Sequence, residues 1–293
     1  MREITLEELL EAGCHFGHQV TRHNPKSRDF VFEARDNIHI IDLAKTKEGL
    51  EAAGAFIKAL ASRGGVLIIL GTKRQARSIV QEALQKAKDN EATEGLFSVT
   101  NRWIGGILTN FSEVAKNYKK LKDITARLKN DDEKAGYTKK EIGLWEKDRQ
   151  KLESFYGGVS EMKKIPDALF IIDTHLEDLA VREARQMGVS TVGIVDTNAD
   201  PAVIDYPIPA NDDAVGSIKL IVDYIIDAWI EGKKAQSANL KAQNTETKDT
   251  EKTKEVVVKI EEVKKEEQKE EKTVKRKAKS AKRKTTAKSS KED

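Results

Sequence analysis

Short apolar runs that alternate with helical stretches constrain the fold of this chain most strongly. Val66–Leu70 is apolar throughout and ends at Gly71, and a similar run covers Ala168–Ile172. A third run, Thr191–Val195, has the same character. Continuous apolar runs of this length are typical of parallel strands that are covered on both faces. Strands separated by helices predict βαβ units with right-handed crossovers, and therefore an α/β fold with a parallel sheet flanked by helices.

Helical stretches fill the gaps between these strands. We expect helices at residues 44–62, from a Thr72 cap to about Lys88, at 176–187 and at 212–232. A further short helix is expected near the N-terminus, because Thr5 and Glu8 have the spacing of a capping box and Gly13 follows as a stop. The apolar runs at 30–32 and 38–41 flank a polar turn, which predicts a β-hairpin.

Residues 111–156 interrupt the alternation of strands and helices. Apolar residues recur at steps of three and four from Phe111 to Leu128 and again from Ile142 to Phe155, on either side of the polar stretch Asn130–Thr138. A narrow apolar seam with charged flanks is typical of a coiled coil, so we expect an inserted antiparallel coiled-coil hairpin. Such a hairpin either binds a partner or is a purely structural insertion, and periodicity alone does not choose between the two.

The charge of the chain is distributed unevenly. The sequence has 52 Lys and Arg against 49 Asp and Glu, and the segment Lys272–Lys291 holds ten basic residues and no acidic one. The remainder therefore has 42 basic against 49 acidic residues, so any contact with nucleic acid must come from local patches. The basic segment either attracts RNA phosphates through counterion release or only keeps the chain soluble.

These patterns divide the chain into three parts. An α/β domain is expected at 1–110 plus 157–232, the inserted hairpin at 111–156, and a charged tail at 233–293. The tail has no aromatic residue and few apolar ones, so we expect it to be disordered.

The cellular setting follows from three absences in the sequence. Cys14 is the one cysteine, so no intrachain disulfide forms, which fits a reducing compartment. The charged segment Met1–Glu11 is unlike a signal peptide, and no apolar run approaches the ~18 residues that span a membrane. We expect a soluble, cytoplasmic protein with no membrane partner.

A basic loop near the N-terminus is the first candidate site. Planar and cationic side chains in a loop suit contact with an RNA backbone and stacking on bases. This loop contains His18, Arg22, His23, Asn24, Lys26 and Arg28. Cys14, His15, His18, His23 and His39 are also crowded together, but their spacing differs from that of regular zinc sites. We therefore predict no metal and no cofactor, and leave zinc at this cluster as an open alternative.

Two further segments are candidates for RNA contact. Lys73 and Arg74 open a predicted helix after a strand, where free N–H groups favour a phosphate. The segment lacks the Walker pattern, so an RNA phosphate fits as well as a nucleotide does. Arg102 and Trp103 suit phosphate pairing and base stacking, although Trp103 suits a buried anchor equally well.

Two acidic residues raise the alternative of an enzyme. Asp173 and Asp196 follow two predicted parallel strands, at the edge where α/β sheets bind ligands, and two such carboxylates could hold magnesium. Capping of the following segments explains them more simply, because no third ligand or nucleophile motif accompanies them. The sequence contains no catalytic triad, Walker loop or dinucleotide glycine motif. We therefore predict that the protein is not an enzyme.

Several segments, taken in order, resemble one known family. They are FGHQ at 16–19, NPK at 24–26, IHIIDLAKT at 38–46, GTKRQA at 71–76, NRWIGGILTN at 101–110, VDTNADP at 195–201 and IPANDDA at 208–214. Together they are similar to the signatures of bacterial small-subunit ribosomal protein S-two. The match runs from about residue 3 to about residue 231 and does not include the tail.

The resemblance implies more than the patterns above predict. It implies a flavodoxin-like α/β domain with an inserted coiled-coil hairpin, and a structural role in the small ribosomal subunit during translation. The partners implied are ribosomal RNA and neighbouring small-subunit proteins, including the mRNA-binding ribosomal protein S-one. Which nucleotides are contacted, which basic residues dominate and what the tail does stay undetermined by the sequence.

Overall fold

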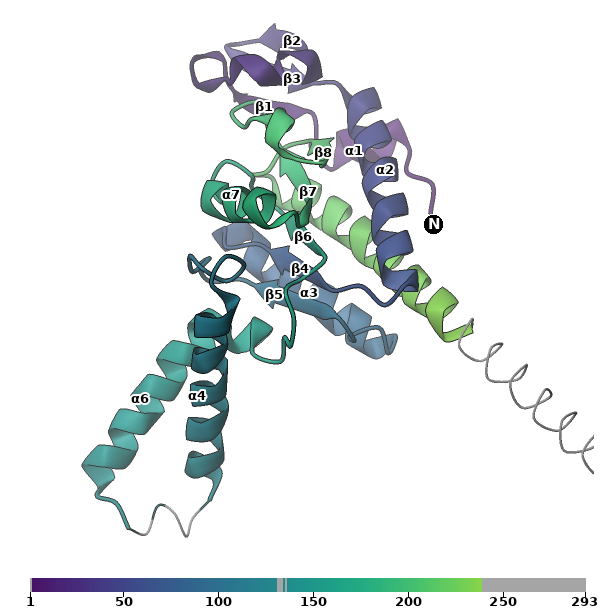
Figure 1. The fold of residues 1–293 in the computed structure, drawn as a ribbon. Helices are drawn as coiled ribbons and strands as arrows, with labels where there is room; N and C mark the ends of the chain where they lie inside the picture. The colour runs from purple at the N-terminus through teal and green to yellow at the C-terminus, as the bar shows by residue number, and fades with distance from the viewer. Residues whose placement is uncertain (1, 131–133, 135, 239–293) are drawn as a thin grey trace, which may run out of the picture. The chain divides into compact units, whose positions relative to one another are not determined.

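A five-stranded parallel sheet forms the centre of the unit Met1–Gln236 in the computed structural model (Figure 1). Its strands are β4 (Leu67–Leu70), β5 (Leu96–Val99), β6 (Ala168–Ile171), β7 (Ser190–Val195) and β8 (Tyr206–Pro209). Their spatial order is β5-β4-β6-β7-β8. When the strands are counted along the chain this is the order 2-1-3-4-5 of flavodoxin-like sheets. The predicted α/β class is confirmed.

Helices cover both faces of this sheet because alternate residues of each strand point to opposite sides. On one face Leu67 and Ile69 pack with α2 (Leu43–Ser62), α3 (Arg74–Asp89) and the closing helix, residues 215–238. On the other face Ile68 and Leu70 pack with α7 (Asp178–Met187) and with the base of the inserted helices. Strands β4 and β6 are therefore buried throughout, as their unbroken apolar sequences predict.

The structure describes residues 2–130, 134 and 136–238. Beyond Met1–Gln236, the chain forms a second unit, Ser237–Asp293, nearly all of which lies outside the described residues. The predictions for the tail beyond residue 238, including its basic segment Lys272–Lys291, therefore lie outside them as well.

A small antiparallel sheet precedes the large one in the chain. It contains β1 (Phe16–Gln19), β2 (Val31–Arg35) and β3 (Ile38–Ile41), in the order β1-β3-β2. The β2–β3 hairpin was expected, and its turn places Asp36 and Asn37 at positive φ. Strand β1 was not expected, since the sequence patterns place His18 in a basic loop. Helix α1 (Leu6–Glu11) begins with the expected Thr5–Glu8 capping box.

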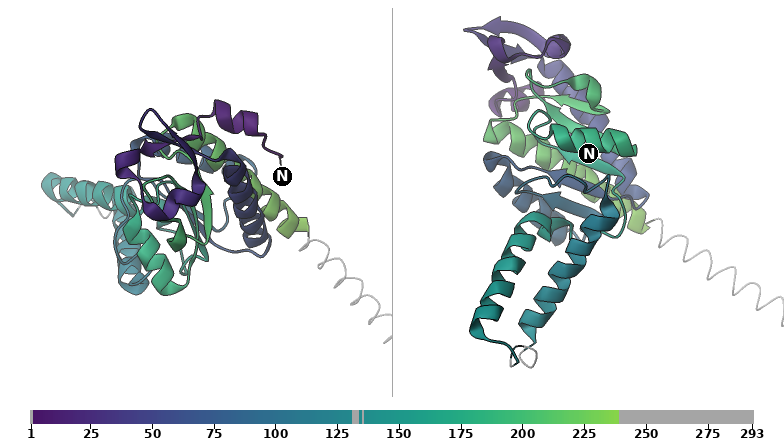
Figure 2. Two further views of the ribbon diagram at one scale, coloured as in Figure 1. Left: turned by 90° about the horizontal axis from the view of Figure 1, so that it is seen from above. Right: turned by 60° about the vertical axis from the view of Figure 1, so that its left-hand side comes forward.

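The inserted segment forms two long helices. They are α4 (Phe111–Lys129) and α6 (Lys139–Tyr156), which lie side by side and extend away from the sheet (Figures 1 and 2). Tyr118 packs edge-on against Tyr156 at the base of the pair, with 5.6 Å between ring centroids. Both helices agree with the expected bounds, whereas the coiled-coil packing and the three-part division of the chain stay predictions.

Candidate functional site at the carboxyl edge of the sheet

Three acidic residues and one lysine meet where the parallel strands end. Lys73 follows β4, Asp173 follows β6, and Asp212 and Asp213 lie in the loop after β8. The Lys73 ammonium is 3.0 Å from Asp173 Oδ2, 2.9 Å from Asp212 Oδ1 and 2.6 Å from Asp213 Oδ1. The carbonyl of Asp212 accepts a further hydrogen bond from it at 3.0 Å. This edge includes the switch point between β4 and β6, where flavodoxin-like sheets bind ligands.

His18 reaches the same edge from β1 of the small sheet. Its Nδ1 lies 3.1 Å from Oδ2 of Asp196, which follows β7. Its Nε2 lies 3.6 Å from Asp213 Oδ2 and 3.3 Å from the amide nitrogen of Asn198. The backbone N–H of His18 also donates to Thr197 Oγ1 at 2.9 Å. These contacts join the small sheet to the parallel sheet through the imidazole and the backbone of His18.

The close approach of the two sheets depends on Gly17. A Cβ at this position would lie 2.7 Å from the Thr197 methyl group and 3.1 Å from the carbonyl oxygen of His39. Any larger residue would therefore push β1 away from the loop after β7, and His18 would move with it.

Burial and charge shift the pKa values of this cluster. Burial, together with the nearby charges of Asp173 and Asp196, raises the pKa of Asp212 to about 7. The hydrogen bond to Asp196 raises the pKa of His18. Burial opposes the charge of Lys73, but the carboxylates of Asp212, Asp213 and Asp173 outweigh it and raise the pKa of the ammonium. The cluster therefore holds more negative charge than its one lysine neutralises.

The arrangement can hold a divalent cation. His18, Asp196 and Asp212 each offer a ligand atom, and these atoms lie within 4.8 Å of one another. Asp196 and Asp212 are each 1 % exposed, and Oδ2 of Asp212 accepts no hydrogen bond. An imidazole with two carboxylates is a ligand set that zinc and similar cations accept. The sequence patterns pointed instead to Asp173 with Asp196 for magnesium, and Asp173 is paired with Lys73.

The cysteine–histidine alternative for zinc does not form in the structure. Cys14 is fully buried and burial raises the pKa of its thiol, and Cys14 is not part of the cluster of His18, Asp196 and Asp212. His39 is buried in β3 with neither ring nitrogen hydrogen-bonded, and its ring lies 5.1 Å from that of His23. The rings of His39 and His23 therefore contact each other.

The basic loop presents its cations to solvent. Arg22, Lys26 and Arg28 are exposed, while Lys26 forms an ion pair with Asp200 at 2.6 Å. The amide oxygen of Asn24 caps the turn by accepting from the N–H of Lys26, and the N–H of Asn24 donates to the carbonyl of Thr197 at 2.8 Å. Asn24 therefore shapes the loop and holds it against the parallel sheet.

The other predicted contact residues separate into exposed and buried groups. Arg74 and Arg102 are exposed. Lys73 is tied to three carboxylates, so the expectation that it binds a phosphate has no support from its position. Trp103 is 4 % exposed and its indole N–H donates to Glu183, which leaves no free face for a base. Of the two alternatives for Trp103, the buried anchor is the one observed.

Glu183 is a structural residue that the sequence patterns did not reveal. It lies on α7, is 6 % exposed, and accepts from the backbone N–H groups of Gly106, Leu108 and Thr109 as well as from Trp103. One buried carboxylate thus fixes the segment that leads into α4. Its signal in the sequence is only an acidic residue on the apolar face of a helix.

The described residues contain no helix that is long and apolar enough to cross a membrane.

The family described as "Ribosomal protein S2" matches residues 9–232 of the chain. The chain is also similar to the small ribosomal subunit protein uS2 of Geotalea uraniireducens (strain Rf4). The two are 46 % identical over 251 residues, which cover 86 % of this chain and 94 % of the relative. On the extent of both matches, this chain belongs to the ribosomal protein S2 family.

Proposed function

We propose that this chain binds ribosomal RNA through three groups of exposed cations, on the basic loop, beside the carboxyl edge of the sheet, and on the inserted helices. As a member of its family the chain is a structural, non-enzymatic component of the small ribosomal subunit. It associates there with ribosomal RNA and other subunit proteins. The match over residues 9–232 is the observation that carries this function.

The basic loop supports the first group of contacts. Arg22, Lys26 and Arg28 are exposed on a loop that the Thr197 carbonyl holds in place through Asn24 and Ser27. A loop held in one shape loses little entropy when it binds, so its cations contribute more of their attraction to phosphates. Arg74 and Arg102 extend the basic surface, whereas Lys73 and Trp103 stabilise the fold.

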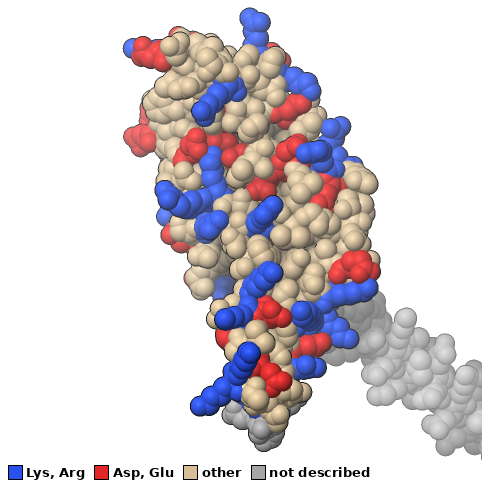
Figure 3. Space-filling view, turned by 90° about the vertical axis from the view of Figure 1, so that its left-hand side faces the viewer, with Lys and Arg blue, Asp and Glu red and all other residues tan. Residues whose placement is uncertain are grey.

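The inserted helices support the last group. A groove of about 370 Å³ on this pair is lined by four cations, by the two carboxylates of Asp123 and Asp148, and by the half-buried ring of Trp145, so its lining is positively charged on balance. The cations are Lys116, Lys119, Lys120 and Arg127. Basic and acidic side chains alternate over this face, and basic ones project from the inserted helices in the lower part of Figure 3. A cationic groove with an aromatic side chain suits an RNA backbone.

Two finer assignments rest on the family resemblance. We infer that the chain contacts the mRNA-binding ribosomal protein S-one and that it acts in the cytoplasm. The cluster around His18 and Asp212 supports binding of a cation, because ligand atoms of His18, Asp196 and Asp212 converge there and Lys73 is already paired.

Sedimentation of the assembled subunit tests the proposal. Chains in which Arg22, Lys26 and Arg102 are replaced by Ala should fold normally but reach the small-subunit fraction of a sucrose gradient at reduced occupancy. A matched variant with Ala at the exposed residues Arg63, Lys88 and Lys234 should sediment like the unchanged chain. Equal occupancy for both variants would show that Arg22, Lys26 and Arg102 are not part of the proposed contact. If the unchanged chain stays at the top of the gradient as free protein, the ribosomal role is contradicted.

A further inference from the structure

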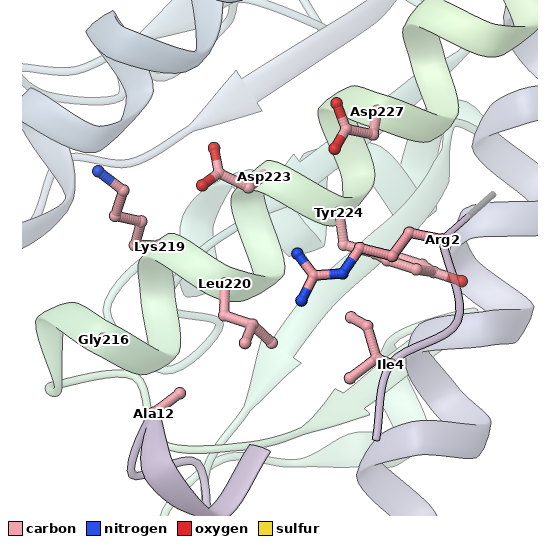
Figure 4. Close-up of a pocket in the computed structure, with 9 residues that line it drawn as sticks. All are labelled: Arg2, Ile4, Ala12, Gly216, Lys219, Leu220, Asp223, Tyr224 and Asp227. Atoms are coloured by element: carbon pink, nitrogen blue, oxygen red, sulfur yellow. The ribbon is translucent and has the colours of Figure 1, made fainter. Parts of the chain in front are cut away.

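Two groups of acidic side chains differ in how their charge is balanced. In a pocket of about 300 Å³ between the N-terminal segment and the closing helix, Asp223 and Asp227 share the lining with the chain's own Arg2, whose side chain lies in the pocket (Figure 4). At the carboxyl edge of the sheet, among the described residues, four carboxylates face one ammonium, that of Lys73, and one imidazole, that of His18. The four carboxylates are those of Asp173, Asp196, Asp212 and Asp213. The second group therefore has an excess of negative charge.

Asp212 is buried with one carboxylate oxygen that has no donor. Its side chain is 1 % exposed, and its Oδ1 is 2.9 Å from the Lys73 ammonium, whereas its Oδ2 accepts no hydrogen bond. A buried carboxylate oxygen without a partner costs free energy unless a positive charge or a donor meets it. His18 and Asp196 each offer a ligand atom within 4.8 Å of one on Asp212, so these three side chains would surround such a charge.

The contact between His18 and Asp196 has the dimensions of a metal site. Nδ1 of His18 is 3.1 Å from Oδ2 of Asp196. Two ligand atoms of a tetrahedral zinc ion, with bonds of about 2.0–2.1 Å, lie roughly 3.3 Å apart. Oδ1 of Asp196 accepts from the N–H of Thr197 at 2.5 Å and from its hydroxyl at 3.1 Å, which fixes this carboxylate with Oδ2 beside the imidazole.

The second ring nitrogen of His18 also lies near a carboxylate. Its Nε2 is 3.6 Å from Oδ2 of Asp213. Histidines that bind metals usually present their other nitrogen to a carboxylate, a carbonyl or a water, and this partner sets the tautomer and the ring orientation. The side chains of His18 and Asp213 are 18 % and 55 % exposed, so an ion can reach the buried oxygens from this side.

We propose that His18, Asp196 and Asp212 bind one zinc ion, which ties the small sheet to the loops after β7 and β8. An imidazole with two carboxylates suits zinc better than magnesium, which prefers oxygen ligands and retains several waters. Because His18 is the first residue of the basic loop, the ion also fixes one end of that loop. The inference rests on the proposed function only in taking this loop as a contact with RNA.

Titration of zinc into the purified full chain, first freed of metal with EDTA, tests the site by calorimetry. We expect His18→Asn and Asp212→Asn each to weaken zinc binding by at least about tenfold, because even outer-shell partners of a metal contribute about that much. His23→Asn is the matched control for the imidazole. Asp200→Asn is the control for a carboxylate on the loop after β7. Both controls should bind zinc like the unchanged chain.

Zinc should also stabilise the unchanged chain. At a free zinc concentration near 100 times Kd, the melting temperature should rise by about 5–10 °C. Trypsin should cleave more slowly after Arg22, Lys26 and Arg28, because the ion holds one end of their loop. Magnesium at the same concentration should produce neither change. If Asp212→Asn does not fold, His18→Asn decides the test, and its circular dichroism without metal shows whether it is folded.

Three results would each overturn the proposal: no zinc binding by the unchanged chain, equal loss of affinity in the ligand variants and the controls, or an equal response to magnesium. Because incorporation into the subunit is measured separately by sedimentation, a lack of zinc binding leaves the proposed function standing. Failure to incorporate, in turn, leaves the zinc measurement valid.

Discussion

Replacement of Glu183 by glutamine should destabilise the protein far more than its conservative size suggests. Oε1 of Glu183 accepts from Trp103 Nε1 at 3.3 Å and from Gly106 N at 2.8 Å. Oε2 accepts from Leu108 N at 3.2 Å and from the N–H and hydroxyl of Thr109 at 3.3 and 3.2 Å. In Glu183→Gln an NH2 group replaces one of the two carboxylate oxygens. The less damaging orientation places this NH2 group at the position of Oε1, where it faces two donors, rather than at Oε2, where it would face three.

The magnitude follows from those two donors. Each donor that loses its acceptor in a buried site costs ~1–3 kcal/mol, and the contributions are not additive within one network. We therefore expect Glu183→Gln to lower the free energy of unfolding by about 3 kcal/mol. At ~2–4 °C per kcal/mol for a domain of this size, the melting temperature should fall by about 6–12 °C.

Urea unfolding followed by circular dichroism measures the change. Glu82→Gln is the matched control, because Glu82 is 63 % exposed and its pair with Lys219 contributes ~0–1 kcal/mol. If Glu183→Gln lowers the free energy of unfolding by an amount within about 0.5 kcal/mol of that for the control, the view that one carboxylate fixes the segment before α4 is refuted.

Four further outcomes are expected. Asn37→Val should cost about 1–2 kcal/mol in urea unfolding, because position 37 has φ of 62°, which β-branched residues avoid. Trp229→Phe should cost about 1–3 kcal/mol by the same assay, since Trp229 is fully buried and its N–H donates to the Ala92 carbonyl at 2.8 Å. Burial lowers the pKa of the His39 imidazole, so the unfolded chain binds a proton at this residue more readily, and the contribution of His39 to stability should be lost as pH falls through about 6.5. In melting curves His39→Leu should therefore lose less stability than the unchanged chain over that pH range, and an equal loss would contradict it. The slope of RNA affinity against salt, measured by filter binding, should fall by about one unit for each cation–phosphate pair that replacement of Arg22, Lys26 or Arg102 removes.

The strands and helices that carry strong local signals were predictable from sequence. Strands β4 and β6 are unbroken apolar runs, and the Thr5–Glu8 capping box of α1 depends on residues three apart. Strand β5 was missed because four residues with a central serine form no distinct run. Strand β8 was missed because Pro207 and Pro209 argue against a strand. Both prolines are tolerated here because β8 lies at the edge of the sheet.

The site was predictable only in part because its contacts are distant along the chain. Asp173 and Asp196 could be placed at one edge of the sheet from the strands that precede them. Asp212 could not, since the strand before it was not recognised. His18 could not, since strand β1, which positions it, was not expected. Thr72 was expected to cap α3, but its hydroxyl donates to Glu177 and Lys73 occupies the capping position. Tertiary contacts thus replaced the local ones that the sequence suggested.

The anchoring of the basic loop to the loop after β7 has a consequence for how the protein is made. Asn24 and Ser27 bind the carbonyl of Thr197, and His18 binds Asp196, so the loop takes its shape from residues about 170–180 positions later in the chain. At a synthesis rate of ~5–20 residues per second, those residues follow the loop by roughly 10–40 s. The basic loop is therefore among the first segments to leave the ribosome that makes the chain. It is also among the last to acquire a fixed shape. During that interval the cations of the loop are not held in position, so the nascent chain attracts RNA through charge alone and without specificity.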